Sequence, residues 1–409
     1  MTTEKIIVAY SGGLDTSVIP AWLKENYDAK VISVFVDVGQ NADFKEIEER
    51  AYAAGTDKFI VLDLKDEFVT QYIWPLVKAG AVYEDDYVLG SAMTRPMIAS
   101  KLIDVAKEEE AKYIAHGGTG KQNDQVRFES TIHALDPYIK IIAPWRKWDM
   151  HSRDDLIAYA KEHKIPVEPV SDIQYSRDLN LWSVSHEGAH LENPWHAHRE
   201  DVHLMSKARE QAPDLPGYVE LEFVKGVPVA LDGDELPPVD LIMRLNELGG
   251  EHGVGVVDIV ENRLVGMKSR AVYESPGGTI ILNAHKTLEK LVLDRETLFE
   301  KGQIARRYAQ LIYDGRWFTP LREAIDAFVD VTQEVVTGTV SMKLFKGNAI
   351  AIASKSPESL YNVEYATFGE DRVFNQRDAE GYTNITSIPM KIRAFLKHQT
   401  SRSTDSIKY

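Results

Sequence analysis

The 409-residue sequence contains no cysteine. Disulfide bonds, thiolate nucleophiles, cysteine-ligated zinc and iron–sulfur clusters all need cysteine side chains, so the sequence excludes all four. We therefore expect no redox cofactor.

Long apolar runs and an excess of positive charge are also missing. No segment approaches the ~20 apolar residues of a membrane helix, and the short first run, "KIIVAY", is no secretory signal. We expect a cytoplasmic protein without a membrane partner. The net charge of −16 repels phosphate backbones, so nucleic acid is not an expected partner either. A single core rarely exceeds ~250–300 residues, which predicts at least two domains.

The first 168 residues alternate apolar runs with helical patterns, which predicts an α/β domain with a doubly wound parallel sheet. The predicted strands cover residues 5–10, 29–38, 57–64, 111–118 and 139–145. The predicted helices cover residues 16–26, 42–54, 66–77, 92–110 and 151–163, with Asp149 or Ser152 capping the last.

The sequence pattern of residues 169–370 predicts a second domain of the α+β class. Residues 171–216 have the composition of a loop, whereas later patterns predict hairpins over 218–233 and 338–354 and helices over 237–250, 284–313 and 319–336. The tail, 371–409, has an apolar stripe of Ile388, Ile392, Phe395 and Leu396 on a short helix. Residues 391–409 carry five Lys or Arg against one Asp. This tail predicts docking onto a neighbouring subunit, with membrane binding or disorder as alternatives.

The segment "SGGLDTS", residues 11–17, follows the first predicted strand. Phosphate loops direct backbone N–H groups at an anion, and Gly12 and Gly13 carry no Cβ that would block its approach. Asp15 is unusual beside phosphate, so it indicates either Mg²⁺ or a helix cap. The spacing matches neither a Walker A loop nor a G-x-G-x-x-G fingerprint, and a tight turn without a ligand remains an alternative.

The string S-G-G-x-D-T-S at the end of strand one resembles the loop of the ATP pyrophosphatase (PP-loop) superfamily. Further segments resemble the argininosuccinate synthase family, in order over nearly the whole chain. They are "YEDDYVLGSAMTRP" (83–96), "HGGTGKQNDQVRFE" (116–129), "IIAPWR" (141–146), "HGVGVVDIVENRLVGMKSRAVYESPGGTI" (252–280) and "SPESLYN" (356–362).

This resemblance implies a fold, a reaction and an assembly. The fold would be an adenine nucleotide alpha hydrolase-like nucleotide-binding domain, a synthetase domain and a C-terminal oligomerisation tail. The reaction would condense L-citrulline with L-aspartate through a citrullyl-adenylate, consuming ATP with Mg²⁺ and releasing AMP and pyrophosphate. Such enzymes serve arginine biosynthesis and the urea cycle, usually as homotetramers whose C-terminal helix clasps neighbouring subunits.

The resemblance also implies site residues. For ATP these are Ala9, Tyr10, Ser11, Gly12, Gly13, Leu14, Asp15, Thr16, Ser17, Val36 and Gly117. For aspartate they are Thr119, Asn123 and Asp124. For citrulline they are Tyr87, Ala92, Asn123, Arg127, Ser176, Ser185, Glu261 and Tyr273. No residue is assigned to metal, although Asp15 could meet Mg²⁺.

The charged residues of this set suit their expected ligands. The carboxylates of Asp124 and Glu261 suit the ammonium groups of aspartate and citrulline, and Arg127 suits a carboxylate or the ureido oxygen. Each also has an ordinary structural reading. Glu261 could face solvent from a strand, Arg127 could pair with Glu129, and Asn123-Asp124 could cap a helix over 125–134.

The sequence departs from the family pattern at three positions. Ala92 stands where the family usually has a hydroxyl. The adjacent Ser91 could partly substitute for it, although the Ser91 side chain is expected to point elsewhere. Gly118 and Gln122 stand where Ala and Gly are common. These changes bear on substrate affinity rather than on the reaction.

Three rival functions remain open. "HEGAH", residues 186–190, fits the zinc protease motif H-E-x-x-H, with His196, His198 and His203 as further ligands, but Gly188 and the following "ENP" argue against the helix it needs. A tRNA-modifying PP-loop enzyme would need cysteines for thiolation or a basic face for binding RNA, whereas this chain has no cysteine and a net charge of −16. A nucleotide-binding module without catalysis would not need pockets for two amino acids.

Overall fold

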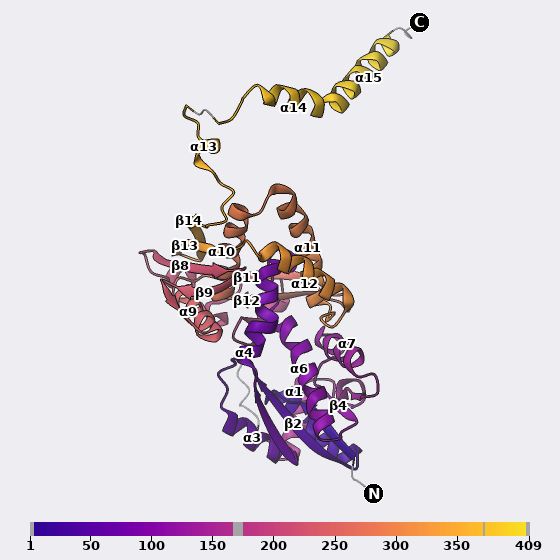
Figure 1. The fold of residues 1–409 in the computed structure, drawn as a ribbon. Helices are drawn as coiled ribbons and strands as arrows, with labels where there is room; N and C mark the ends of the chain where they lie inside the picture. The colour runs from indigo at the N-terminus through magenta and orange to yellow at the C-terminus, as the bar shows by residue number, and fades with distance from the viewer. Residues whose placement is uncertain (1–3, 167–174, 371–372, 406–409) are drawn as a thin grey trace. The chain divides into compact units, whose positions relative to one another are not determined.

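The structure is a computed structural model that describes residues 4–166, 175–370 and 373–405 (Figure 1). The chain forms two compact units, residues 1–358 and 359–409. The domain boundary predicted after residue 168 lies outside the described residues, and the one predicted after residue 370 adjoins two more such residues.

The first sheet is parallel and has the strand order β3-β2-β1-β4-β5. Its strands are β1 (Glu4–Ala9), β2 (Ala29–Asp37), β3 (Lys58–Asp63), β4 (Tyr113–Ala115) and β5 (Lys140–Ile142). The central strands β1 and β2 are almost continuously buried, as expected for a sheet covered on both faces. All five predicted strands are confirmed, although β4 and β5 end earlier than the apolar pattern.

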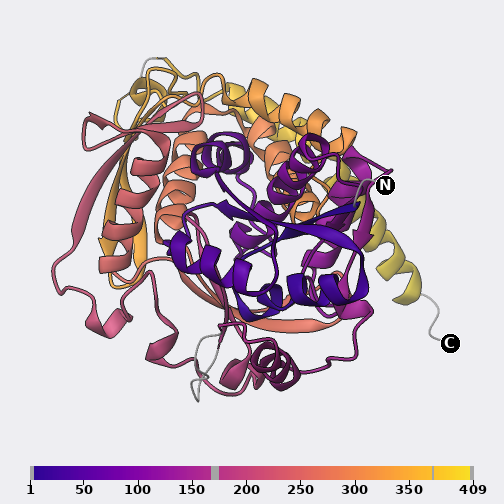
Figure 2. The same ribbon diagram turned by 90° about the horizontal axis from the view of Figure 1, so that it is seen from below.

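Helices cover both faces of this sheet (Figure 2). Alternate residues of β1 enter two separate cores. Ile7 lies in the core that includes α6 (Gly90–Glu108), and Ile6 lies in the core that includes α2 (Ile19–Asn26) and α8 (Arg153–Glu162). The elements are α1 (Leu14–Ser17), α2 (Ile19–Asn26), α3 (Phe44–Ala53), α4 (Lys65–Glu67), a π-helix (Phe68–Ile73), α5 (Trp74–Ala79), α6 (Gly90–Glu108), α7 (Asp124–Leu135), a 3₁₀ turn (Pro144–Arg146) and α8 (Arg153–Glu162).

Two local predictions in this region are refined. The helix predicted over residues 16–26 is divided at Val18 into α1 and α2. Ser152, rather than Asp149, caps α8, because its hydroxyl accepts from the Asp155 amide while the Asp155 carboxylate accepts from the Ser152 amide.

The second sheet is antiparallel and has the order β10-β9-β8-β13-β14. Its strands are β8 (Gly217–Val224), β9 (Val227–Leu231), β10 (Asp234–Glu235), β13 (Gly338–Phe345) and β14 (Asn348–Lys355). Both predicted hairpins are confirmed. Their turns, Lys225-Gly226 and Lys346-Gly347, have positive φ at all four residues, as tight hairpins require. The helices α9 (Pro238–Glu251) and α10 (Pro276–Val292) pack on this sheet.

The third sheet has the order β11-β12-β7-β6 and corrects one prediction. Its strands are β6 (Ser176–Leu179), β7 (Val184–Glu187), β11 (Val256–Asn262) and β12 (Lys268–Glu274). The prediction of loop throughout residues 171–216 is wrong for β6 and β7, which are short and polar and owe their conformation to pairing with β12. Three 3₁₀ turns follow, Ala189–Glu192, Glu200–Val202 and Arg209–Gln211.

Two helices replace the single helical pattern over residues 284–313. They are α10 and α11 (Arg295–Tyr313), and Asp294 begins the second by accepting from the amides of Glu296 and Thr297. The predicted helix over 319–336 is α12 (Pro320–Gln333), capped by Thr319.

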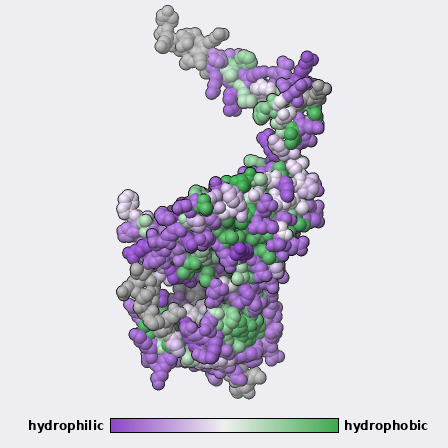
Figure 3. Space-filling view, turned by 90° about the vertical axis from the view of Figure 1, so that its left-hand side faces the viewer, coloured by the Kyte–Doolittle hydropathy of each residue, from purple (hydrophilic) through white to green (hydrophobic). Residues whose placement is uncertain are grey.

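The second unit contains α13 (Val363–Ala366), α14 (Asp378–Thr386) and α15 (Ile388–Asp405). The predicted stripe residues Ile388, Ile392, Phe395 and Leu396 are between 47% and 67% exposed in α15. Figure 3 shows a largely hydrophilic face on which hydrophobic residues gather in patches. Within residues 4–166, 175–370 and 373–405, no helix is both long and apolar enough to cross a membrane.

The strand order explains how the sheet creates a site. The chain leaves β1 toward one side of the sheet and β4 pairs on the other, so the order reverses between these neighbours. Ligands in open α/β sheets bind outside the carboxyl ends of the strands at such a point. The loops "SGGLDTS" and "HGGTGKQND" both begin there.

Candidate active site

A cavity of about 640 Å³ lies at the carboxyl ends of β1 and β4. Most of the predicted residues line it. From the nucleotide set these are Ala9, Tyr10, Ser11, Gly13, Asp15, Thr16, Val36 and Gly117. From the two amino-acid sets they are Asn123, Asp124, Tyr87, Arg127, Ser176, Ser185, Glu261 and Tyr273.

Five predicted residues do not appear in the cavity lining: Gly12, Leu14, Ser17, Thr119 and Ala92. The Ser17 hydroxyl is turned inward and donates to the Gly13 carbonyl at 2.8 Å. Ala92 is fully buried in the main hydrophobic core. Successive residues of an α-helix point about 100° apart. The preceding residue, Ser91, does line the cavity, although its Oγ atom is buried. The citrulline contact at Ala92 and the direction expected for the Ser91 hydroxyl stay predictions.

The first loop is held by its own hydroxyls and by α3. The Ser11 and Thr16 hydroxyls are 3.0 Å apart, and Arg50 of α3 donates to the Gly12 carbonyl. Gly12 has φ +76°, and a Cβ there would lie 2.9 Å from Ile47 Cγ1. Gly12 thus permits the turn and its close packing on α3, while Gly13 faces the cavity.

The structure excludes one of the two roles considered for Asp15. Gly13, not Asp15, is the N-cap of α1, so the helix-capping interpretation is wrong. The Asp15 side chain lies exposed in the first turn and lines the cavity. Its carboxylate is therefore accessible to a cation that accompanies phosphate.

His116 shapes the second loop from beneath. Its ring is fully buried, and its Nδ1 atom accepts a hydrogen bond from the Gly118 amide at 3.1 Å. Its Nε2 atom lies 3.2 Å from the Glu129 carboxylate. An amide can only donate, so Nδ1 carries no proton and Nε2–H donates to the carboxylate. Although burial opposes it, the contact with His116 and the nearby Arg146 lower the pKa of the Glu129 carboxyl. A Cβ on Gly117 would lie 3.0 Å from Thr16 Cγ2, so the two loops approach each other closely.

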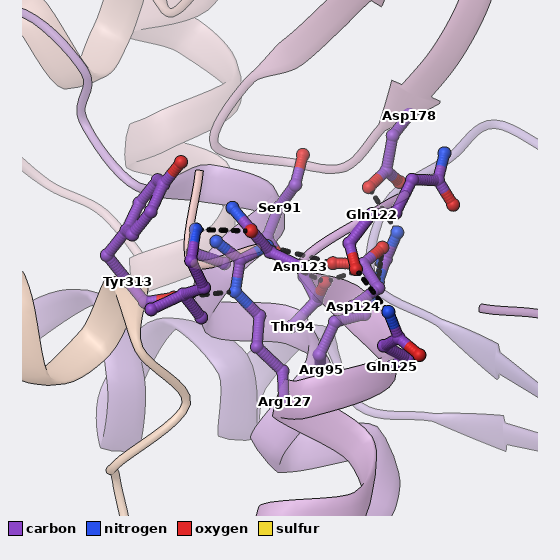
Figure 4. A network of polar contacts seen from close by, with 12 residues as sticks. Ser91, Thr94, Arg95, Gln122, Asn123, Asp124, Gln125, Arg127, Asp178 and Tyr313 are labelled. Atoms are coloured by element: carbon purple, nitrogen blue, oxygen red, sulfur yellow. Dashed lines mark hydrogen bonds and ion pairs between the residues drawn. The ribbon is translucent and has the colours of Figure 1, made fainter. Parts of the chain in front are cut away.

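Asp124 lies between two arginines at the centre of a polar network (Figure 4). Its oxygens accept from Arg95 Nε at 2.9 Å and from Arg127 Nη1 at 2.8 Å. Arg95 also pairs with Asp178. Although burial alone would raise it, these guanidinium groups hold the pKa of the Asp124 carboxyl below its usual range. The alternative pairing of Arg127 with Glu129 is wrong.

Asn123 has an orientation fixed by the β11–β12 turn. The Leu264 amide donates to Asn123 Oδ1 at 2.9 Å, and Arg263 of the same turn donates to the Lys121 carbonyl at 3.0 Å. Because Oδ1 is engaged, the Nδ2 donor is the group left to serve a ligand acceptor. Asn123 is indeed the N-cap residue of α7, but its side chain makes no capping hydrogen bond.

Stacked tyrosines surround Glu261. The rings of Tyr87 and Tyr273 are 4.1 Å apart, and the Tyr273 hydroxyl donates to Glu261 at 3.1 Å. Glu261 is only 3% exposed, so the reading of a solvent-facing strand residue is wrong. Burial and the neighbouring Glu187 raise the pKa of Glu261 to about 7.

Comparisons with known proteins show which family the chain belongs to. The family model described as the arginosuccinate synthase N-terminal HUP domain matches residues 5–166, and the one described as the arginosuccinate synthase C-terminal domain matches residues 175–393. The chain belongs to the argininosuccinate synthase family.

Relatives named argininosuccinate synthase match at full length. The one from Alkaliphilus metalliredigens is 57% identical over 96% of this chain and 95% of its own. The one from Desulfitobacterium hafniense is 55% identical over 97% of this chain and 99% of its own. The one from Carboxydothermus hydrogenoformans is 56% identical over 96% of this chain and 98% of its own.

Family resemblance at single positions missed several residues that line the cavity. They include Ser91, Arg95, Asp178, Glu187, Arg263 and Tyr313. Arg95 lies in "GSAMTRP", where its helical spacing of four from Ser91 was an available signal. Asp178 and Tyr313 come from distant elements and carried no local signal.

The zinc protease interpretation of "HEGAH" is wrong. His186 lies in β7, and Gly188 has φ +79°, so no helix aligns His186 with His190. His186 instead contacts the buried Glu274 at 2.7 Å. No group of three or more metal-ligating side chains occurs in the part of the chain that the structure describes.

Proposed function

We propose that this enzyme of the argininosuccinate synthase family condenses L-citrulline with L-aspartate, converting ATP to AMP and pyrophosphate. One observation supports this best. A single cavity joins a hydroxyl-rich glycine loop to a separate cluster of Asp124, Arg127 and Glu261. A nucleotide site alone would not need the second part, and a tRNA-modifying relative would need a basic one.

The nucleotide occupies the part of the cavity beside β1 and β2. Amides and hydroxyls of residues 11–16 bind the pyrophosphate portion, and Gly13 allows its close approach. Ala9, Tyr10, Val36 and Gly117 surround the remaining nucleotide. Gly12, Leu14 and Ser17 act through the shape of the loop, because they do not line the cavity.

The two amino acids occupy the part between α6, α7 and the third sheet. Glu261 binds the citrulline ammonium, with Tyr87, Arg127, Ser176, Ser185 and Tyr273 around the rest of that substrate. Asn123 donates to an acceptor shared by both substrates. Thr119 and Asp124 bind aspartate, although both Asp124 oxygens are already engaged by arginines, so the ammonium would join an existing charge network.

The reaction then follows in two steps. The citrulline ureido oxygen attacks the α-phosphorus of ATP, pyrophosphate leaves, and a citrullyl-adenylate forms. The aspartate amine attacks the activated ureido carbon, AMP leaves, and argininosuccinate is released. Preorganised donors around the phosphates offset charge that develops in the first step.

Mg²⁺ enters with ATP as part of the substrate. The carboxylate of Asp15 fits an oxygen-preferring cation, and phosphate oxygens and water would provide the other ligands, since the described residues offer no cluster of three.

The remaining assignments are those expected from the family. Residues 1–168 bind ATP, residues 169–370 form the synthetase domain, and residues 371–409 mediate assembly into a homotetramer in the cytoplasm.

Pyrophosphate release from ATP tests the function. We expect release only when both citrulline and aspartate are present, with argininosuccinate formed in equal amount. Release that required only one amino acid, or neither, would contradict the proposal.

A further inference from the structure

The second loop is held at two separate places. At its start, His116 accepts a hydrogen bond from the Gly118 amide, whereas its end is contacted by the β11–β12 turn, residues 263–267. Between these places, Gly120 and Lys121 are exposed, and a Cβ on Gly120 would meet none of the described residues within 4 Å. Packing constrains the middle of the loop little, so the position of its end depends on polar contacts.

Arg263 joins the end of this loop to the third sheet. Its Nη1 atom donates to the Lys121 carbonyl at 3.0 Å, and its Nη2 atom donates to the carboxylate of Glu187 in β7 at 2.7 Å. Both nitrogens belong to one planar guanidinium, whose fixed geometry suits a bridge between two acceptors. The Arg263 side chain lines the cavity and is only 11% exposed, so water screens this ion pair less than a pair on the surface.

The turn that carries Arg263 is itself held in place. The Gly266 amide donates to the Arg263 carbonyl at 3.0 Å, and the Arg263 amide donates to the Met267 carbonyl at 2.9 Å. From the segment before α6, the Tyr83 hydroxyl donates to the Asn262 carbonyl at 3.0 Å. The Arg263 guanidinium therefore extends toward the second loop from a defined point.

The members of the Arg263–Glu187 pair have opposite charges and opposite effects on Glu261. Burial raises the pKa of Glu261 most, Glu187 raises it further, and Arg127 and Arg263 lower it. The titratable tyrosines that face Glu261 are Tyr83, Tyr87, Tyr273 and Tyr313. An effect of the pair through charge therefore differs in sign between its two members, whereas an effect through position has the same sign for both.

We infer that Arg263 is a positioning residue for aspartate binding: paired with Glu187, it holds the end of the second loop where the Leu264 amide orients Asn123. The inference rests on the proposed function, because Asn123 is one of the residues proposed for aspartate. Arg263 acts through the loop and takes no part in bond making. The start of the loop, beside the nucleotide, keeps its separate contact with His116, so ATP binding should not depend on Arg263.

The experiment compares Arg263→Gln, Arg263→Lys and Glu187→Ala in the full-length enzyme. We expect Arg263→Gln to raise the aspartate KM about tenfold, as loss of one hydrogen bond from a charged group predicts, with the ATP Kd little changed. Arg263→Lys keeps a cation that can reach one of the two acceptors, so its aspartate KM should lie between those of wild type and Arg263→Gln. Glu187→Ala should also raise the aspartate KM. The double variant should exceed Arg263→Gln by little, because both changes break the same chain of contacts.

Arg270 provides a matched control on the same hairpin. It donates to the Asp258 carboxylate at 2.8 Å and to the carbonyls of Asn193 and His196, and it is not among the described residues that line the cavity. Arg270→Gln should therefore lower Tm while leaving the aspartate KM unchanged.

The pH dependence of the citrulline KM separates charge from position. The pH below which this KM rises should shift upward in Arg263→Gln and downward in Glu187→Ala, whereas the aspartate KM should rise in both. Aspartate KM values that moved in opposite directions would show that Arg263 acts through charge alone and would overturn the inference. An unchanged aspartate KM in Arg263→Gln would also overturn it, as would equal effects on all three substrates with a lowered Tm. Pyrophosphate release by wild type without aspartate would instead contradict the proposed function.

Discussion

Glu261 combines deep burial with a carboxylate whose charge the proposed site needs. Burial and Glu187 raise its pKa from 4.5 to about 7, so the ligand-free carboxyl is largely neutral below pH 7. Because the folded chain holds this proton more tightly than the unfolded chain, Glu261 becomes increasingly unfavourable to stability as the pH rises from about 4.5 to 7.

We therefore predict that the citrulline KM rises as the pH falls below 7, by up to about tenfold per unit. Glu261→Gln should raise KM at every pH, remove this dependence and increase Tm at pH 8 without ligand. Steady-state kinetics and thermal melts from pH 6 to 8 measure both effects. A wild-type KM that is independent of pH would show that Glu261 does not pair with the ammonium.

Asp124 has a structural role in addition to its expected contact with aspartate. Removing it leaves Arg95 and Arg127 without their shared partner. Breaking a fully buried pair costs about 3–5 kcal/mol, and less is expected here because the Asp124 side chain is 21% exposed. We predict that Asp124→Ala raises the aspartate KM, leaves the ATP Kd nearly intact and lowers the free energy of unfolding.

Asp178→Ala is the matched control for that variant. It removes one partner of Arg95 but leaves Arg95 paired with Asp124, so the loss of stability should be smaller. Calorimetric ATP titration and urea unfolding distinguish the effects. Equal loss of ATP and aspartate binding in Asp124→Ala would assign Asp124 to the nucleotide or to the fold alone.

At the scale of elements, the first turn of α6 fits tightly against the third sheet. A Cβ on Gly90 would lie 1.7 Å from Ser183 Oγ and 2.9 Å from Ser183 Cβ, just before β7. A side chain at position 90 would therefore have to displace Ser183 or shift the start of α6.

Gly90→Ala and Gly302→Ala make a matched pair of helix substitutions. Gly302 lies inside α11 with nothing within 4 Å of an added Cβ, so Gly302→Ala should stabilise by about 0.5–1 kcal/mol. Gly90→Ala should destabilise by roughly 1–3 kcal/mol through overpacking and raise the citrulline KM. Urea unfolding measures both, and equal stabilisation by the two variants would show that the start of α6 shifts freely.

At the scale of the whole molecule, α15 exposes apolar side chains on a strongly acidic protein. Phe395 is 67% and Ile392 53% exposed in the chain by itself. Burying such a stripe against neighbouring subunits would stabilise the assembly by about 25 cal/mol for each Å² of apolar surface removed from water.

We predict that Phe395→Asp reduces the molar mass in solution from that of a tetramer, while Ala394→Asp, at an exposed position on the opposite side of the same helix, does not. Light scattering coupled to gel filtration measures this directly. A tetramer that survives Phe395→Asp would show that the stripe is not the assembly surface.

Local patterns predicted much of the fold. Five parallel strands, both hairpins and most helices follow from apolar runs, helical periodicity and turn residues, because these reflect short-range geometry. Strands β6 and β7 were missed because they are brief and polar, and pairing with β12 rather than propensity makes them strands. The break between α10 and α11 was missed because apolar spacing continued across Asp294, whose capping role depends on one local hydrogen-bond pattern.

The sequence by itself determined the α/β class, the position of both ligand loops and the family resemblance, since each depends on residues close together in the chain. Only the tertiary structure decided which side chains meet. It placed Arg95, Asp124 and Asp178 in one network, fixed the amide of Asn123 through Leu264, and buried Ala92 in the core. Such contacts depend on how helices are rotated and how strands pair between distant segments. No single stretch of sequence contains that information.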